Sequence, residues 1–248
     1  SAEIAPIRVA TKARGKIVVD ALPVTARERV PVPSGAAAPG VWNHVPPPDM
    51  VADPARYGAY VTGDVPAVLV DRDEPVRPDA SLEAMAKLKP LDPGGTVTAG
   101  NASGVNDGAA ALVLASDEYA RRNGIDPLAT VEGHAGAAWD PPYLALTPAM
   151  AAQKLLDRLH LTTADIAVWE FNEAFAAVAL TAAARLGLDP SAINVQGGAV
   201  ALGHPLGASG ARIVASVVHQ LRRRGGGLGI AAICSGGGQG DALLLRVE

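Results

Sequence analysis

The second half of the chain shows two kinds of hydrophobic pattern. Apolar side chains recur every three or four residues in three segments, which predicts helices; these segments are 146–159, 173–187 and 211–224. Between them lie short apolar runs of strand length, bounded by glycine or polar residues; they are 109–116, 165–171, 193–196, 228–235 and 241–247. Strands that alternate with helices predict an α/β fold with mixed sheets.

Local signals predict where some helices begin. Thr147 precedes Pro148, so we expect Thr147 to cap its helix and Pro148 to take the first position, where a missing N–H costs nothing. Ser81 is the predicted cap of a shorter helix over 81–89. The segment 95–104 that follows is predicted to be a strand that runs into a glycine-rich turn.

The first 80 residues differ from the rest, because they hold twelve of the twenty prolines and show little helical periodicity. We expect short strands near 4–9 and 17–19, and then an irregular segment over 21–78. Such a segment is either a disordered linker or an ordered loop. Its aromatic residues favour the ordered loop, since linkers are usually poor in aromatics; they are Trp42, Tyr57 and Tyr60.

Composition and charge exclude several classes of protein. A net charge of −4 without a long basic run argues against an extended nucleic-acid interface. No apolar stretch reaches the roughly 18 residues that a membrane span needs, and the N-terminus lacks the pattern of a signal peptide. Cys234 is the only cysteine, which excludes an intrachain disulfide and a multi-cysteine metal site. We therefore expect a cytoplasmic globular protein without a bound metal.

Reactive side chains follow three of the predicted strands. Asn172 and Glu173 come after DIAVWEF, His204 follows INVQ, and Cys234 follows LGIAAI. Because ligands bind outside the carboxyl ends of strands in open α/β sheets, we expect these groups to meet in one cleft. A histidine and a cysteine there suggest acid–base or thiolate chemistry. The glycines of SGGGQG offer backbone N–H groups that suit an oxyanion.

Each of these residues also has a simpler interpretation. Asn172 fits a helix N-cap, and Glu173 fits a first-turn carboxylate that the helix dipole favours. Cys234 fits a small buried hydrophobe, and His204 fits an ordinary loop histidine. The residues alone therefore support only a cleft with a histidine, a cysteine and an oxyanion hole.

Four ordered blocks carry a resemblance to a known family. GNASGVNDGAAA, NEAFA, NVQGGAVALGHPLGASGAR and CSGGGQG are similar to the signature blocks of the thiolases, and the similarity covers 81–248 firmly. It implies a thiolase-like fold, with mixed sheets and helices on both faces, preceded by an irregular loop domain. The implied parts are a loop-domain remnant over 1–105, a strand and helix of the N-terminal thiolase domain over 106–126, and the C-terminal domain over 127–248.

The resemblance implies roles for four residues in catalysis. His204 matches the histidine that helps to activate the nucleophilic cysteine, and Asn172 matches the asparagine that positions a water in one oxyanion hole. Cys234 matches the acid–base that exchanges a proton with the α-carbon of acetyl-CoA, and the N–H of Gly236 belongs to the second oxyanion hole. We also expect the glycine dipoles and a nearby imidazolium to favour a thiolate at Cys234.

The family's substrate tunnel maps onto a second set of residues. Ser103 and the backbone near Ala99 would lie along the pantetheine of coenzyme A, and Ala174 and Phe175 would line the same tunnel. Leu144 lies where the family has a glycine-rich turn, which here reads ALTP. The implied substrate is an acyl-CoA thioester, with no separate cofactor.

One departure from the family pattern leaves two hypotheses open. Thiolases carry their nucleophilic cysteine in the N-terminal domain, and this sequence has no cysteine before Cys234. The first hypothesis is an acyl-CoA C-acetyltransferase whose nucleophile lies outside these residues: in a separate N-terminal chain, in a part lost by processing, or in a part not included in this sequence. The expected assembly is a homo- or hetero-oligomer, either a dimer or a tetramer. The second is a non-catalytic CoA-ester-binding or assembly subunit. A ketoacyl synthase is disfavoured, because it would need a second catalytic histidine in place of NEAFA.

Overall fold

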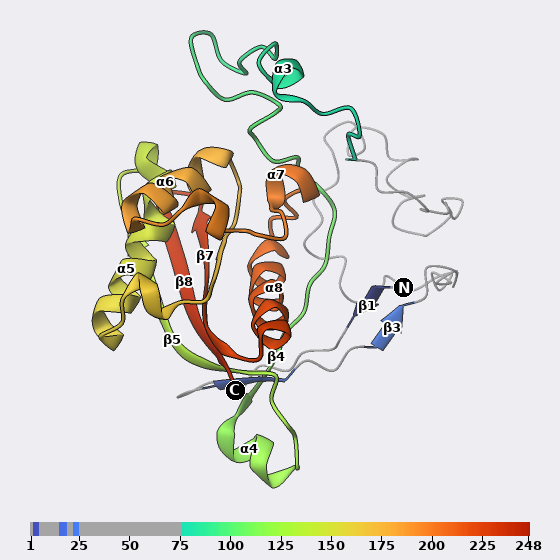
Figure 1. The fold of residues 1–248 in the computed structure, drawn as a ribbon, viewed down its shortest axis with the longest axis vertical. Coiled ribbons are helices and arrows are strands. Elements are labelled where there is room, and N and C mark those ends of the chain that lie inside the picture. The colour runs from blue at the N-terminus through green and yellow to red at the C-terminus, as the bar shows by residue number, and fades with distance from the viewer. Residues whose placement is uncertain (1, 5–14, 19–21, 25–75) are drawn as a thin grey trace, which may run out of the picture. The chain divides into compact units, whose positions relative to one another are not determined.

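A computed structural model describes residues 2–4, 15–18, 22–24 and 76–248 (Figure 1). The strand predicted near 4–9 and most of the irregular segment 21–78 lie outside the described residues. The chain divides into two compact units; one holds Ser1–Glu3 and Pro23–Glu74, and the other holds Ile4–Leu22 and Pro75–Glu248. A two-stranded sheet pairs β1 (Ala2–Ile4) with β3 (Leu22–Val24).

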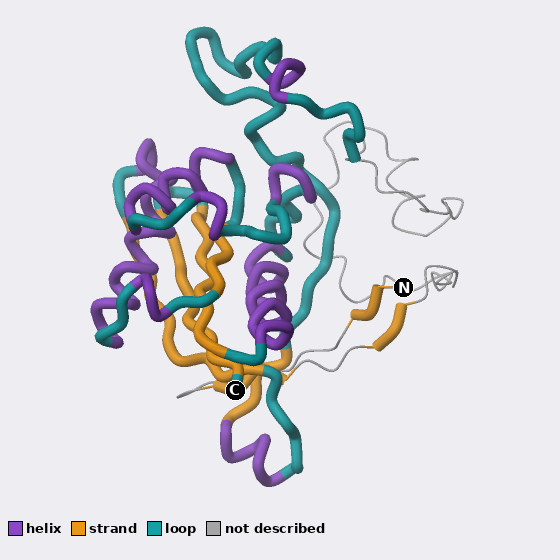
Figure 2. Tube along the Cα trace, in the orientation of Figure 1, coloured by secondary structure: helices purple, strands orange, loops and turns teal. Residues whose placement is uncertain are grey.

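A six-stranded sheet forms the centre of the second unit (Figure 2). Its strand order is β4-β2-β5-β8-β7-β6. The β6–β7 pair is parallel and the other pairs are antiparallel, so the sheet is mixed, as predicted. The strands are β2 (Gly15–Val18), β4 (Val113–Ser116), β5 (Ala129–Ala138), β6 (Val168–Phe171), β7 (Gly227–Ser235) and β8 (Gln239–Val247).

Helices cover both faces of this sheet, which confirms the predicted architecture (Figure 1). Helix α5 (Thr147–Leu159) packs on β5, β7 and β8, with α6 (Ala176–Leu186) beside it. Helix α8 (Ser209–Arg224) packs on β6, β7 and β8 from the other side. The shorter helical elements are α3 (Leu82–Met85), α4 (Asp117–Arg122), η2 (Pro141–Leu146), η3 (Thr163–Asp165), η4 (Pro190–Ala192) and α7 (Ala199–Leu202). No helix within the described ranges combines the length and the apolar character that crossing a membrane requires.

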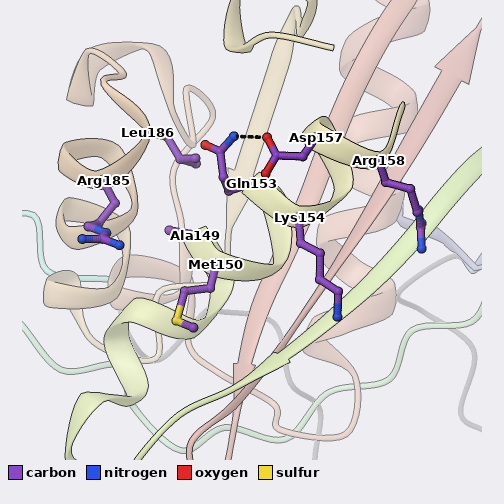
Figure 3. Close-up of a pocket in the computed structure, with 8 residues that line it drawn as sticks. All are labelled: Ala149, Met150, Gln153, Lys154, Asp157, Arg158, Arg185 and Leu186. Carbon is purple, nitrogen blue, oxygen red and sulfur yellow. Dashed lines mark hydrogen bonds between the residues drawn. The ribbon is translucent and has the colours of Figure 1, made fainter. Parts of the chain in front are cut away.

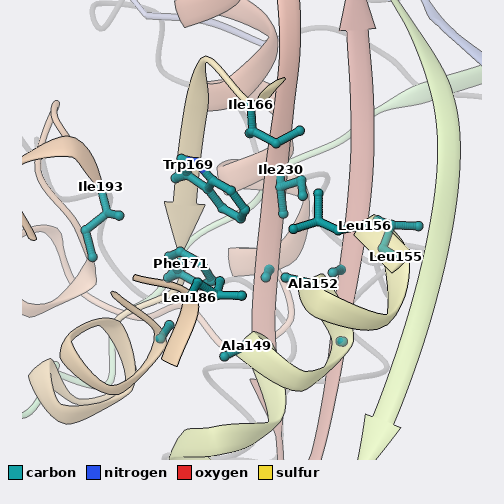
Figure 4. Close-up of a cluster of buried hydrophobic side chains, with 14 of the residues drawn as sticks. Ala149, Ala152, Leu155, Leu156, Ile166, Trp169, Phe171, Leu186, Ile193 and Ile230 are labelled. Atoms are coloured by element: carbon teal, nitrogen blue, oxygen red, sulfur yellow. The ribbon is translucent and has the colours of Figure 1, made fainter. Parts of the chain in front are cut away.

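The two helix layers bury two separate apolar clusters. Figure 4 shows the cluster against α5 and α6, where Leu155 and Leu156 meet Trp169 and Phe171 of β6. The Trp169 and Phe171 rings stack with their centroids 5.7 Å apart. The second cluster lies against α8 and includes Val168, because successive strand residues point to opposite faces. Strand β6 therefore links both cores.

Thr147 begins α5 in a different way from the prediction. It is the first helical residue, and its side chain caps no N–H of the helix. Instead its hydroxyl donates to the carbonyl oxygens of Leu144 and Gln239, at 2.8 and 2.7 Å. The hydrogen bond to Gln239, at the start of β8, therefore replaces the N-cap that the local sequence predicts for Thr147. The prediction for Ser81 is confirmed, since its hydroxyl accepts from the Ala84 N–H.

Three predicted strands are shorter or absent. Segment 95–104 forms no strand, and its Thr98 makes only an isolated bridge with Pro90. Segment 193–196 is likewise reduced to one bridge, between Ile193 and Trp169. The run 109–116 is a strand only from Val113 onward, at the edge of the sheet. Apolar composition alone did not show where neighbouring strands supply partners.

Candidate active site

The carboxyl ends of the parallel strands β6 and β7 bring Asn172 and Cys234 to one edge of the sheet. Phe171 pairs with Ala232, and the Asn172 N–H donates to the Ala232 carbonyl at 2.9 Å, which continues the ladder. Cys234 follows two residues later on β7. Asn172 is fully buried and Cys234 is 9% exposed. The predicted convergence of strand ends is therefore correct for these two residues.

His204 reaches the same edge through a constrained loop. Its N–H donates to the Gly104 carbonyl at 2.9 Å, and it forms a parallel bridge with Val105. The preceding Gly203 has φ +94°, and a Cβ there would lie 2.3 Å from Oδ1 of Asn106. Only glycine tolerates both the positive φ and the close approach of Asn106, so Gly203 fixes the backbone position from which the His204 side chain extends.

The hydrogen bonds of the imidazole indicate one tautomer. The Ser209 hydroxyl donates its single proton to the Pro205 carbonyl at 3.1 Å, so it accepts from His204 Nδ1 at 2.6 Å. Nε2 then carries a free lone pair. The Asn172 amide Nδ2 lies 3.4 Å from Nε2 and faces this lone pair as a donor. His204 is therefore arranged to accept a proton at Nε2.

The surroundings of His204 and Cys234 favour the neutral form of both side chains. Burial lowers the pKa of His204, and the positive charge of Arg212 lowers it further. Burial also raises the pKa of the Cys234 thiol. The expectation that loop dipoles favour a thiolate is not met within this chain, because the loss of solvation is the larger effect. Among the described residues, no hydrogen bond joins Cys234 to His204 or Asn172.

The glycine turn after Cys234 is a tight hairpin between β7 and β8. Gly237 and Gly238 have φ of +81° and +79°. Gly238 is packed against Trp139, whose N–H donates to the Gly238 carbonyl at 2.8 Å. Gly236 is exposed, and its N–H bonds to no other described residue. A backbone donor thus remains available two residues beyond the thiol.

Three of the predicted tunnel residues lie together. The N–H and hydroxyl of Ser103 both donate to the Ala174 carbonyl, at 3.2 and 2.9 Å. Ala102 pairs with Phe175 in an isolated bridge. Ala99 is an exposed residue earlier in the same loop. This loop runs on to Gly104 and therefore connects the tunnel residues with the backbone of His204.

Leu144 is linked to the glycine hairpin. It lies in η2, and its carbonyl accepts from the Thr147 hydroxyl, which also holds Gln239 at the end of the glycine hairpin. No hydrogen bond links Leu144 to Ser103 or Ala174 in the part of the chain that the structure describes. The structure therefore ties the Leu144 backbone to the end of the glycine hairpin through Thr147.

Asn194 is a supporting residue that the sequence analysis did not single out. Its side chain accepts from the Phe171 N–H and donates to the Phe171 carbonyl, both at 2.8 Å, as a neighbouring strand would. It also donates to Glu173 at 2.7 Å, and Glu173 accepts from the Val200 N–H at 3.1 Å. These bonds tie the loop before His204 to the end of β6. The one local signal was its residue type, since asparagine tolerates the left-handed backbone that Asn194 adopts, with φ +47°.

The simpler interpretations of Asn172 and Glu173 are wrong. The N-cap of α6 is Phe175, and α6 begins at Ala176. Asn172 therefore caps no helix, and Glu173 lies outside the first turn. The Asn172 side chain instead faces His204 and Arg212, and the Glu173 side chain bonds to Asn194 and to the Val200 N–H.

One hollow lies away from these residues. It has a volume of about 720 Å³ and is lined by residues of α5 and α6 (Figure 3). The positively charged side chains that line it point in different directions. Lys154 and Arg158 bond to carbonyls of β5, and Arg185 extends from α6 on the other side. It includes none of the predicted site residues, so the chemistry of the strand ends identifies the site better than cavity size. The described residues include no cluster of three potential metal ligands.

Comparison with known proteins identifies the family of this chain. The thiolase C-terminal domain model matches residues 125–247, and the thiolase N-terminal domain model matches residues 60–118. A β-ketoadipyl-CoA thiolase of Pseudomonas knackmussii is 52% identical over 189 residues, 75% of this chain and 47% of the relative. An acetyl-CoA acetyltransferase of Rhizobium meliloti is 49% identical over 180 residues, 72% of this chain and 46% of the relative.

Solved structures agree with these matches. Human mitochondrial 3-ketoacyl-CoA thiolase in complex with CoA is 45% identical, with a TM-score of 0.68 over 71% of this chain and 45% of that one. Acetyl-CoA acetyltransferase of Bacillus anthracis is 46% identical, with a TM-score of 0.69 over 73% of this chain and 46% of that one. The chain spans about half the length of the curated relatives it matches. It belongs to the thiolase family.

Proposed function

We propose that this chain provides the proton-transfer half of an acyl-CoA C-acetyltransferase, which cleaves or forms 3-ketoacyl-CoA thioesters. The observation that carries the proposal is the Asn172–His204 pair, in which an amide donor and an imidazole lone pair lie 3.4 Å apart at the strand end next to Cys234. The names of its relatives, acetyl-CoA acetyltransferase and β-ketoadipyl-CoA thiolase, support the same reaction class.

The proposed step in the cleavage direction is a proton transfer to carbon. The bond between the α-carbon and the keto carbon breaks, and the acyl group passes to a nucleophilic sulfur outside these 248 residues. The electron pair left on the α-carbon takes the proton of the Cys234 thiol. Burial keeps this thiol protonated by raising its pKa, which suits a proton donor. In condensation the same proton returns to sulfur.

The developing oxyanions need donors at the strand ends. We assign one to the N–H of Gly236. The other is assigned to the Asn172–His204 pair, in which Nε2 of His204 becomes an N–H donor once it has taken the proton of the nucleophilic thiol. Fixed donors in a site with little water stabilise an enolate without reorganisation. The loop through Ser103 and Ala174 would hold the pantetheine chain. In this role no metal or resident cofactor is required.

One observation favours a second function. Cys234 is the only cysteine of the 248 residues, so no second thiol is present here to carry an acyl group. A CoA-ester-binding or assembly subunit would need none. Such a subunit would bind acyl-CoA but would transfer no proton.

Kinetics of the native protein, isolated with any polypeptide that accompanies it, separate these two functions. Cys234→Ala should slow acetoacetyl-CoA cleavage by about 10²-fold or more, the scale of general acid–base catalysis. His204→Asn should impair both acylation and condensation. His160→Asn is the matched control, because His160 is exposed and caps α5 in a left-handed conformation that asparagine tolerates. Binding of acyl-CoA without turnover would support the second function.

We also propose that the active form is an oligomer. Strand β4 lies at the sheet edge and pairs only with β2 among the described strands. An unpaired strand edge favours association with another chain. Light scattering of this chain alone should show association, and a monodisperse monomer would contradict the proposal.

A further inference from the structure

Arg212 is a half-buried cation beside the Asn172–His204 pair that the proposed chemistry does not use. It lies in the first turn of α8, one turn after Ser209. Its Nη2 donates to Oδ1 of Asn172 at 3.5 Å. Its Nε is buried and has no hydrogen-bond partner among the described residues. An incompletely bonded guanidinium destabilises a fold, so its position calls for a reason.

The guanidinium decides which end of the Asn172 amide faces His204. An arginine side chain has hydrogen-bond donors and no acceptor, so it binds the amide oxygen and is repelled by the amide NH2 group. The oxygen therefore turns to Arg212, and Nδ2 turns to His204 Nε2 at 3.4 Å. If the amide were rotated by 180°, its NH2 group would face the N–H groups of Arg212, and its oxygen would face the lone pair of His204 Nε2.

A buried acid, Glu170, interacts electrostatically with Arg212. Glu170 is 1% exposed and accepts from the Gln220 side chain at 2.6 Å, and Gln220 also donates to Ser216 at 3.1 Å. Burial raises the pKa of Glu170, whereas Gln220, Ser216 and the charge of Arg212 act in the opposite direction. Glu170 lies on β6 and Asn172 directly follows the end of this strand, and Arg212 acts on the charge of Glu170 and donates to Asn172.

We propose that Arg212 is a positioning residue that fixes the Asn172 amide with its NH2 group toward His204. The catalytic consequence rests on the proposed function, whereas the amide orientation is a property of the fold. The charged and titratable groups around the pair are Arg212 on α8, Glu170 on β6, Glu173 after β6 and Cys234 on β7. Of these, Arg212 lowers the pKa of His204, after the larger effect of burial.

The test is selective ¹⁵N labelling of histidine and asparagine side chains in the native protein. Arg212→Gln should shift the Asn172 amide signals and raise the pKa of His204, because a nearby positive charge is lost. Arg212→Lys should retain the orientation of the Asn172 amide and the lowered pKa of His204, because a lysine ammonium is also positively charged and also only donates. Arg222→Gln is the matched control: it lies on the same helix, is exposed, and should change neither signal.

The outcomes distinguish this inference from the proposed function. Unchanged Asn172 signals and an unchanged His204 pKa in Arg212→Gln would overturn the positioning role. So would equal changes in Arg222→Gln. If Arg212→Gln does not fold, Arg212→Lys decides: a reversed orientation of the Asn172 amide there would overturn the role. In an active enzyme, Arg212→Gln should lower kcat at least tenfold with little change in KM and move the acidic limb of the pH profile upward. If Arg212→Gln alters the Asn172 amide signals but the native protein has no thiolase activity, the positioning role stands and the proposed function is rejected.

Discussion

The two faces of β6 show how one strand serves stability on one side and chemistry on the other. Toward α5 and α6 it presents Trp169 and Phe171, which pack in a cluster of apolar side chains. Toward α8 it presents Val168 and Glu170, and Glu170 is bonded to buried Gln220. Burial of polar groups costs free energy even when they are bonded well. The α8 side therefore contributes less to stability and holds the polar groups that lead to Asn172.

The largest expected effect is a loss of stability when the apolar face of β6, toward α5 and α6, is disrupted. Phe171→Ala should lower the free energy of unfolding by about 3–5 kcal/mol, because a fully buried ring is replaced by a cavity. Leu180→Ala in α6 is the control; its side chain is 57% exposed and the change should stay within about 0.5 kcal/mol. Denaturant unfolding measures both. Equal losses would show that the apolar cluster does not dominate stability.

A smaller loss in the free energy of unfolding is expected at Gly203, whose backbone positions His204. Gly203→Ala would force φ +94° on alanine and bring its Cβ to 2.3 Å from Asn106 Oδ1. We expect a loss on the order of 1–3 kcal/mol, together with displaced His204 signals. Gly207→Ala lies in the same loop with no neighbour within 4 Å of the new Cβ, so it should be tolerated. Thermal unfolding and NMR compare the two variants, and equal behaviour would refute the steric account.

The smallest effect concerns the pH dependence of the α8 side. Burial raises the pKa of Glu170 above its ordinary value, 4.5, so the folded state retains a proton that the unfolded state releases. The contribution of this group to stability is therefore present below pH 4.5 and declines as pH rises toward the folded pKa. Glu170→Gln should remove this decline, whereas Glu118→Gln on exposed α4 should not. Unfolding curves across pH that show the same decline in both variants would contradict the assignment.

The same comparison explains what the sequence could predict. Periodicity located α5, α6, α8 and the strands β6, β7 and β8, because their apolar residues repeat locally. It failed for 193–196, where the Asn194 side chain and not a strand ladder pairs with Phe171.

The site was predictable to a similar extent. Asn172, His204 and Cys234 follow apolar runs, so their approach to one edge could be expected from strand topology. The roles of Ser209, Arg212 and Thr147 depend on contacts with distant segments, which no local pattern contains. The same holds for the pKa of Cys234, which depends on how deeply β7 is buried.

The central claim is that Cys234 moves the α-proton of a CoA thioester. The direct measurement is deuterium incorporation into the methyl group of acetyl-CoA in D₂O, catalysed by the native protein and followed by NMR. We predict exchange in the wild type and a loss of about 10²-fold or more in Cys234→Ala, while acylation of the nucleophile persists. Exchange at the wild-type rate in Cys234→Ala would contradict the claim.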